Sequence, residues 1–288
     1  MDIQFKEFLS NLSEVELMSR QVKSSTDKEY ELMVKNHQSL IENGMEQHSS
    51  SLHNMFFRSL ISGEPIFYDH MSLDFDRRIK DLINRRNKHY LWLLAEAFEY
   101  FEDLIELMYA HMGHKEPSAW PSKETKGETA ASLATKPFDW YLQKAESNKK
   151  LHAKLECIRK RFPALAAAEK SNHFGIDLRF TICLIEMLRH IVVHNNGRIR
   201  DLTKFIQRTF EQAGMSNNGN HDPQKLQQIH NFIATDSRGH RVVMLEIPQS
   251  GTPFHVDRLG AIINWLLAYS DYIYHRLIRP TYFPSQQA

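Results

Sequence analysis

Apolar residues recur at intervals of three and four along most of this chain, a spacing that places them on one face of an α-helix. Near the N-terminus the pattern covers residues 3–20 and resumes after Ser24-Ser25-Thr26-Asp27, whose side chains suit a helix N-cap. A third helical stretch, residues 49–62, ends at Gly63-Glu64-Pro65. We therefore expect residues 1–70 to form a helical arm that packs on the rest of the chain or binds a partner.

The remainder of the chain has the pattern of a helical bundle. Helices are expected at about residues 74–112, 137–161, 174–197, 200–212 and 255–278. Residues 115–136 are rich in Pro, Ser, Thr, Gly and Glu, which predicts an exposed loop. Between residues 231 and 247 the period changes to that of a β-hairpin with its turn at 236–239. The predicted fold class is predominantly all-α, a multi-helix bundle over residues 71–288 with long helices and one small β-hairpin.

The helix at 174–197 has three faces when it is unrolled at about 100° per residue. One apolar stripe consists of Ile176, Phe180, Cys183, Met187 and Ile191, and a second, on the opposite side, consists of Leu178, Ile182, Ile185 and Val192. Between the stripes, an arc of roughly 140° carries Arg179, Glu186, Arg189, His190 and His194. A helix that is buried on two sides and gathers these side chains on its one polar arc is the best candidate for a functional site.

The end of this helix resembles the motif of a known superfamily. The string Arg189-His190-Ile-Val-Val-His194-Asn195 resembles the R-x4-H motif of the HEPN (higher eukaryote and prokaryote nucleotide-binding) superfamily, in which an Arg, a polar residue and a later His lie near the end of a long helix. Arg189 and His194 match the two catalytic positions, and His190 takes the polar position, which is often Asn. Asn195 follows directly and is included in the catalytic set.

The resemblance covers residues 74–201 and the C-terminal helix. Its context includes Phe98-Glu99-Tyr100-Phe101-Glu102 in the earlier long helix and Asn195-Asn196-Gly197 after the motif. It implies an endoribonuclease that cleaves RNA without a metal, leaves a 2′,3′-cyclic phosphate and acts in toxin or anti-phage defence. It also implies a homodimer through the Arg189–His194 helix, and an antitoxin or sensor is a possible further partner.

Arg and His are sufficient for this chemistry. An imidazole can take the proton of a ribose 2′-hydroxyl or give one to the leaving oxygen, and a guanidinium can hold phosphate oxygens as charge develops. Arg189 and His194 lie about 7.5 Å apart along one helix axis, which is poor geometry for gripping a single phosphate. A twofold-related copy would bring an Arg and a His from two chains into one cleft, so we expect a dimer.

Glu186 lies one helical turn before His190. It could orient that imidazole or pair with Arg189, and pairing is the preferred interpretation.

Net charge excludes a global basic field. The formal charge is only +1, so contact with nucleic acid requires a local patch. The early part of the 74–112 helix offers one, with Arg85, Arg86 and Lys88 as candidate RNA-backbone contacts. A solvated face is the preferred interpretation, because Asp and Asn residues dilute the run of positive charge.

Neither metal chemistry nor a membrane is favoured by the sequence. Cys157 and Cys183 lie in apolar helical patterns far from other ligands, which predicts reduced core residues in a cytoplasmic protein. His111 and His114 are better explained as helix-end residues than as ligands, and His221-Asp222 before a proline is more typical of a turn. We expect no metal or cofactor, and no membrane span, since no apolar run reaches about 18 residues.

Two other functions stay open. The chain could be a HEPN-like module that binds a nucleotide or a protein without catalysis, with Arg189 and His194 holding the ligand or stabilising an interface. It could also be an unrelated helical protein that uses His190 and His194 in a metal site.

Overall fold

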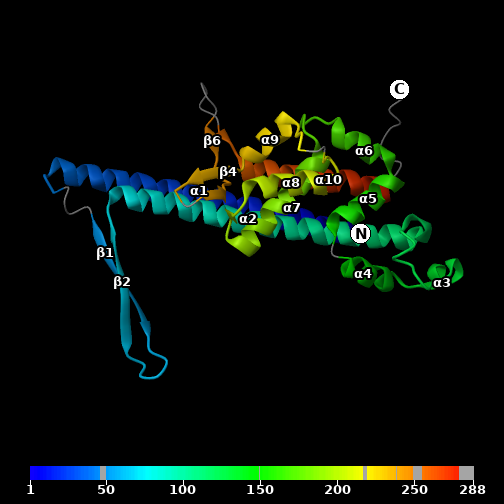
Figure 1. Ribbon diagram of the computed structural model, residues 1–288, viewed down its shortest axis with the longest axis horizontal. Helices are drawn as coiled ribbons and strands as arrows, with labels where there is room; N and C mark the ends of the chain where they lie inside the picture. The colour runs from blue at the N-terminus through cyan, green and yellow to red at the C-terminus, as the bar shows by residue number, and fades with distance from the viewer. Residues whose placement is uncertain (46–49, 149, 217–218, 238, 249–254, 279–288) are drawn as a thin grey trace. The chain divides into compact units, whose positions relative to one another are not determined.

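The computed structural model describes residues 1–45, 50–148, 150–216, 219–237, 239–248 and 255–278 (Figure 1). Most of these residues are α-helical, which confirms the predicted fold class. The chain divides into two compact units, here called the first unit (residues 1–16 and 91–288) and the second unit (residues 17–90). This division differs from the predicted boundary at residue 70, because two long helices, α1 (Asp2–Glu42) and α2 (Phe75–Lys115), each contribute to both units.

In the second unit, α1 runs without interruption through the predicted N-cap at Ser24-Ser25-Thr26-Asp27. The hydroxyl groups of Ser25 and Thr26 donate to the carbonyl of Val22, the local bonding that such residues adopt inside a helix. The start of α2 packs on this helix, with the ring of Phe75 stacked on His37 at a centroid separation of 3.9 Å. The expected break in the N-terminal arm is therefore wrong.

The expected helix at residues 49–62 is also wrong. Two antiparallel strands, β1 (Ser51–Arg58) and β2 (Pro65–Leu73), form a hairpin in the second unit (Figure 1). Cross-strand ring pairs explain the choice, with Phe56 5.9 Å from Phe67 and Phe57 6.1 Å from Tyr68. The apolar residues of β1 match a helical spacing, but their partners in β2 lie beyond any local window.

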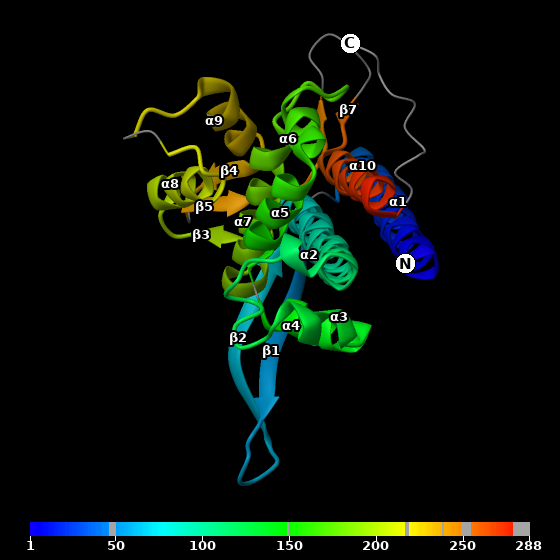
Figure 2. The same ribbon diagram turned by 90° about the vertical axis from the view of Figure 1, so that its right-hand side faces the viewer.

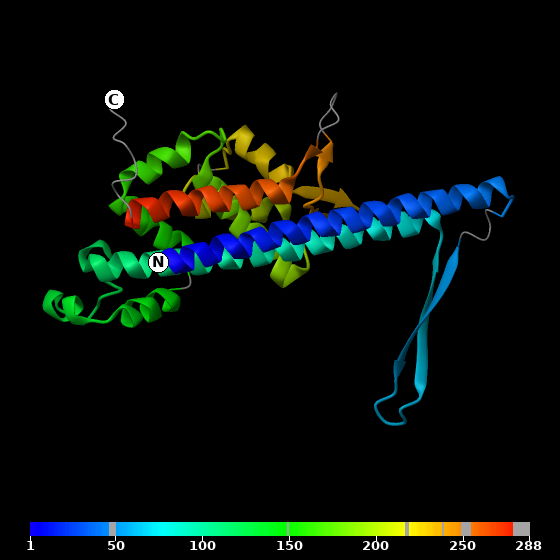
Figure 3. The same ribbon diagram turned by 180° about the vertical axis from the view of Figure 1, so that it is seen from behind.

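The first unit is built around α7 (Leu178–Asn195), the helix that the sequence singled out. It contacts α6 (Pro163–Lys170), α8 (Leu202–Gln212) and α10 (Arg258–Ile278), and α5 (Leu151–Arg161) packs on α6 (Figure 2). The beginning of α1 lies beside the end of α10, where Phe5 stacks on Tyr274 at 4.0 Å (Figure 3). The expected helix at 137–161 is two helices, α4 (Phe138–Ser147) and α5.

The segment 115–136 is more structured than expected. It contains a 3₁₀ turn, η2 (Pro117–Ala119), and a short helix, α3 (Ala130–Thr135). Trp120 is buried, donates a hydrogen bond of 3.0 Å to the carbonyl of Tyr109 and stacks on that ring. A Cβ atom at Gly113 would lie 2.3 Å from Trp120, so glycine here admits the indole instead of ending α2.

Small sheets complete the first unit. β3 (Arg198–Ile199), β5 (Gly239–Val242) and β4 (Ile233–Asp236) lie in the order β3-β5-β4, and β6 (Ile247–Pro248) pairs with β7 (His255–Val256). The β4–β5 pair confirms the expected hairpin, although its turn residue Arg238 lies outside the described residues. The predicted C-terminal helix begins later than expected, at Arg258, and α9 (Pro223–His230) precedes β4.

Candidate functional site

The second apolar stripe of α7 is buried, and the first is buried at Phe180 and Cys183 and half-buried at Ile176, Met187 and Ile191. Leu178, Phe180, Ile182, Cys183, Ile185 and Val192 are all buried. On the polar arc, Glu186 and Arg189 are half-buried, and His190 and His194 are exposed. The helix begins at Asp177, whose carboxylate accepts from the backbone of Phe180. It ends at Asn196, whose φ of 51° is left-handed, as the Asn-Asn-Gly sequence predicts.

A cleft of about 630 Å³ opens beside this arc, entirely within the first unit. Four helical segments line it, and the lining residues are Phe98, Glu102, Lys150, His152, Glu186, Met187, Arg189, His190, Arg208, Glu211 and Gln212. The structure therefore brings Arg189, His190 and Glu186 together with three cationic or imidazole side chains from α5 and α8 that the sequence did not single out.

Arg189 is held by a residue of another helix. Its Nη2 donates to Oε1 of Glu99 on α2 at 2.7 Å, and the Arg189 side chain is 24% exposed. Its Nε–H is buried and has no acceptor among the described residues. The preferred pairing of Arg189 with Glu186 is therefore wrong, because α2 supplies a closer carboxylate. An anion in the cleft could offer Nε the acceptor that the protein does not.

Glu186 instead accepts a hydrogen bond of 2.5 Å from Nε2 of Gln212 on α8. Burial, followed by repulsion from Glu102, raises the pKa of Glu186 to about 7. Burial also raises the pKa of Glu102. Close to neutral pH, Glu186 is therefore divided between its neutral and charged forms, which is unusual for a carboxyl group.

His190 and His194 lie side by side, with ring centroids 4.5 Å apart. Burial lowers the pKa of His190, and the nearby positive charges of His194, Arg189 and Arg208 lower it further. His190 is thus favoured in its neutral form near pH 7. Neither imidazole makes a hydrogen bond to any residue that the structure describes, so both rings are free to contact a ligand.

Other predicted site residues do not line this cleft, and His194 is one of them, although its ring lies beside that of His190. Asn195 is the last residue of α7, and its side chain makes no hydrogen bond within the described part of the chain. Arg85 pairs with Glu29 at 2.5 Å and Arg86 with Asp27 at 2.9 Å, both inside the second unit. Lys88 is exposed. Two of the three candidate RNA contacts are thus already paired within their own unit, which favours the solvated-face interpretation.

Sequence reasoning missed Glu99, Lys150, His152 and Arg208. A signal existed for Glu99, because it lies with Glu102 on the segment Phe98-Glu99-Tyr100-Phe101-Glu102, which we had associated with the motif. No local signal marks Lys150, which precedes the first residue of α5, or Arg208, which belongs to an ordinary amphipathic helix.

The other histidines that the sequence analysis considered as possible metal ligands contact aromatic rings. Both His111 and His114 make edge contacts with the ring of Phe138. His221 stacks on Phe210 at 4.2 Å, and the carboxylate of Asp222 caps α9, as expected of a turn. In the described ranges, no group of three or more His, Cys, Asp or Glu side chains has the arrangement of a metal site.

Both cysteines are free thiols, with Cys183 buried and Cys157 half-buried. Among the residues described, no helix is long and apolar enough to cross a membrane.

No family model, no curated protein and no solved structure matches this chain.

Proposed function

We propose that this chain is a metal-independent endoribonuclease of the HEPN type, with Arg189 and His194 as its catalytic pair. The observation that carries the proposal is the cleft beside α7, which is lined by the partly buried Arg189, by His190 and by two further cations, Lys150 and Arg208. The ring of His194 lies outside that lining, 4.5 Å from the ring of His190. Imidazole for proton transfer and guanidinium for a developing phosphorane charge are the groups that RNA transesterification needs.

The reaction follows from these groups. His194 takes the proton of a ribose 2′-hydroxyl as O2′ attacks the adjacent phosphorus atom, and the P–O5′ bond breaks. A protonated imidazole gives a proton to O5′, which leaves as a 5′-hydroxyl, and the other product ends in a 2′,3′-cyclic phosphate. Throughout, Arg189 binds the non-bridging oxygens. His190, whose pKa is lowered, stays neutral and forms a hydrogen bond beside the reacting atoms.

Charge in the cleft also suits a phosphate. Below a pH of about 7 the carboxyl of Glu186 is largely neutral, so the cations of the cleft meet less opposing negative charge. Acidic neighbours remain in and beside the cleft, namely Glu102, Glu99 and Glu211. These carboxylates distinguish the site from a uniformly basic surface that binds nucleic acid in general. We therefore infer that one scissile phosphate is bound here, and that a long RNA backbone is not.

The proposed active form is a homodimer through α7. In one chain Arg189 and His194 are separated by five residues of helix, about 7.5 Å along the axis. A twofold-related α7 would place the Arg of one chain near the His of the other, which completes two equivalent sites. The proposed setting is cytoplasmic toxin or anti-phage defence, with an antitoxin or sensor protein controlling access to RNA.

One observation favours a second candidate, a HEPN-like module that binds a nucleotide or protein without catalysis. The guanidinium of Arg189 is already neutralised by Glu99, so in a purely structural role this pair would tie α7 to α2. The two candidates differ in what Glu99→Gln does. If Arg189 is catalytic, freeing it leaves RNA cleavage intact or raises it. If the pair is structural, the variant only loses stability.

The experiment that tests the proposal uses purified full-length protein and mixed RNA in excess EDTA. Wild type should cleave, His194→Ala should not, and the matched control His173→Ala, an exposed histidine outside the cleft, should behave as wild type. Cleavage that is lost in EDTA and restored by zinc would point to a metal enzyme, and cleavage that persists in His194→Ala would remove the catalytic assignment.

A further inference from the structure

A second cavity lies at the N-terminal end of α7. It has a volume of about 590 Å³, within the range of small-molecule sites, and its lining is mainly apolar. Asp177 lines this cavity and Glu186 is the first residue of α7 to line the cleft, nine residues or about 14 Å further along the axis, and the two linings share no residue. Both belong to the first unit.

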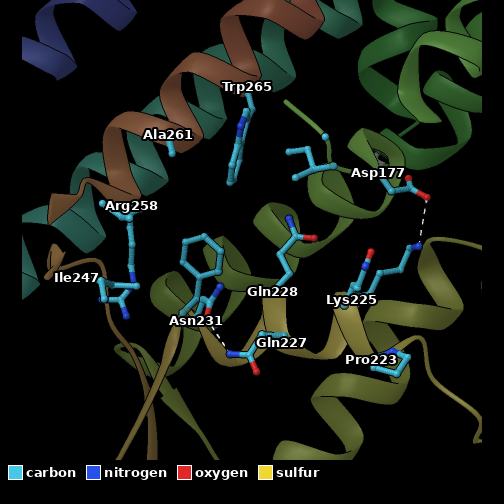
Figure 4. Close-up of a pocket in the computed structure, with 15 residues that line it drawn as sticks. Asp177, Pro223, Lys225, Gln227, Gln228, Asn231, Ile247, Arg258, Ala261 and Trp265 are labelled. Carbon is cyan, nitrogen blue, oxygen red and sulfur yellow. Dashed lines mark hydrogen bonds and ion pairs between the residues drawn. The ribbon is translucent and has the colours of Figure 1, made fainter. Parts of the chain in front are cut away.

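Two walls face each other across this cavity (Figure 4). Trp265 and Arg258 extend into it from α10, and Gln228 and Asn231 approach from α9 and the residue that follows it. Ile247 and Val256 also line the cavity. A slot with an aromatic ring and aliphatic side chains on one side and carboxamides on the other suits a flat molecule that has polar atoms along its edge.

Several of the polar groups in this cavity have unused bonding capacity. The indole of Trp265 has no ring contact or hydrogen bond with any described residue. Gln228 uses its amide nitrogen on Thr181, which leaves its carbonyl oxygen free. Asn231 accepts from Gln227 through its oxygen, which leaves its NH₂ group. The cavity therefore presents an aromatic face, an acceptor and a donor that no residue in the described part of the chain satisfies.

Arg258 supplies a charge. Its Nη1 donates to the carbonyl of Leu245, but its Nε–H is buried and has no acceptor among the residues that the structure describes. Burial lowers the pKa of Arg258, and the attraction of Glu246 does not fully offset this. The other cation of the lining, Lys225, is already paired with Asp177 at 3.6 Å and Asp222 at 3.1 Å. A half-buried guanidinium with an unused donor is the natural partner of a phosphate or carboxylate oxygen.

We propose that this cavity is a binding site for a small planar heteroaromatic anion, whose ring lies against Trp265, whose edge bonds to Gln228 and Asn231, and whose acidic group meets Arg258. The acidic group could be the phosphate of a nucleotide or the carboxylate of an aromatic acid, and the chemistry of recognition is shared. The proposal does not depend on ribonuclease activity, because none of these residues lines the cleft beside His190.

Ligand-observed NMR and calorimetry on the full chain test this with matched probes. They are adenosine 5′-monophosphate against adenosine, indole-3-acetate against indole-3-acetamide, and cyclohexylacetate as the anion without an aromatic ring. At least one aromatic anion should bind about tenfold more tightly than its neutral match, because a charge-assisted hydrogen bond is lost in the match. Cyclohexylacetate should not bind. Which pair responds tells a nucleotide source from an aromatic acid.

Variants locate the site. Trp265→Leu and Arg258→Met should each weaken binding by about tenfold or more, whereas the exposed controls Trp92→Leu and Arg200→Met should leave it unchanged. Ala261→Phe fills the cavity from α10 and keeps the proposal testable if either variant unfolds. The proposal is overturned if neither aromatic anion binds with a Kd below about 1 mM, or if binding persists in the folded cavity variants.

Discussion

The two halves of α7 line sites that differ in their electrostatics. In its C-terminal half, Glu186, Arg189 and His190 line a cleft in which burial disfavours charged forms, and the pKa values of Glu186 and His190 are displaced from their usual range. At its N-terminal end, Asp177 caps the helix and its charge is matched by Lys225, beside a mainly apolar cavity. Charges that the fold leaves uncompensated are characteristic of functional sites, which is why we propose catalysis at the first site and ligand binding at the second.

The largest expected effect is on RNA cleavage. His194→Ala should lower the rate by about 10²- to 10⁴-fold, the usual contribution of a positioned proton-transfer group. The melting temperature should barely change, because the His194 side chain is exposed and fills no apolar stripe. Single-turnover cleavage and thermal unfolding measure the two effects. A large loss of stability would instead make the His end structural and erase the contrast between the two ends.

The next effect is on the free energy of unfolding, which depends on the protonation of Glu186. The pKa of Glu186 is raised from 4.5 to about 7, so the folded state binds a proton that the unfolded state has released. This lowers wild-type stability progressively between pH 4.5 and 7, by at most about 3 kcal/mol. Glu186→Gln should remove the penalty.

Urea unfolding at pH 5 and pH 8 measures this. The advantage of Glu186→Gln over wild type should be small at pH 5 and larger at pH 8. Glu211→Gln, the same change at an exposed residue of the cleft, serves as the control. Equal differences at both pH values would mean that Glu186 carries no such penalty.

A dimeric site predicts partial rescue between two inactive proteins. If each site takes Arg189 from one chain and His194 from the other, a mixed dimer of Arg189→Ala and His194→Ala chains has one intact site. With free exchange about half the dimers are mixed and half of their sites are whole, so about a quarter of wild-type activity should return. Co-refolding followed by the RNA assay measures it. No return, despite demonstrated exchange, would place both residues of a site in one chain.

The smallest effect lies at the other end of the helix. Asp177→Ala removes the N-cap of α7 and should destabilise the first unit by about 1 kcal/mol. Asp177→Asn keeps the accepting oxygen and should cost less. Both should cleave RNA as wild type does, which chemical denaturation and the cleavage assay check together. Loss of cleavage in Asp177→Asn would show that the two ends are coupled.

Local pattern was enough to predict α7 because its stripes and its Asn-Asn-Gly end are encoded within one segment. The second stripe is buried, the first is buried at Phe180 and Cys183, and Asn196 adopts the left-handed conformation. The same spacing rule failed at residues 51–58, because Leu52, Met55 and Phe56 fit a helix equally well and only cross-strand partners decide the matter. Gly113 resembled a helix stop, yet it admits Trp120, seven residues later in the chain.

Only part of the candidate site could be predicted from the sequence. Arg189, His190 and Glu186 share one helix face, so their proximity followed from spacing. Their hydrogen-bond partners could not be predicted from spacing, because Glu99 and Gln212 come from α2 and α8 and reach the site through tertiary packing. The sequence offered Arg85 and Arg86 as RNA-backbone contacts, but in the structure they form ion pairs with Glu29 and Asp27.

The most direct test of the central claim is the chemistry of the RNA ends. A defined oligoribonucleotide is incubated with wild type in EDTA, and the products are analysed by mass spectrometry beside the same oligonucleotide carrying a single 2′-deoxy sugar at the cleaved position. The account predicts 2′,3′-cyclic phosphate and 5′-hydroxyl ends, no cleavage at the deoxy sugar and no cleavage by His194→Ala. Products with 3′-hydroxyl and 5′-phosphate ends, or cleavage at the deoxy position, would contradict it.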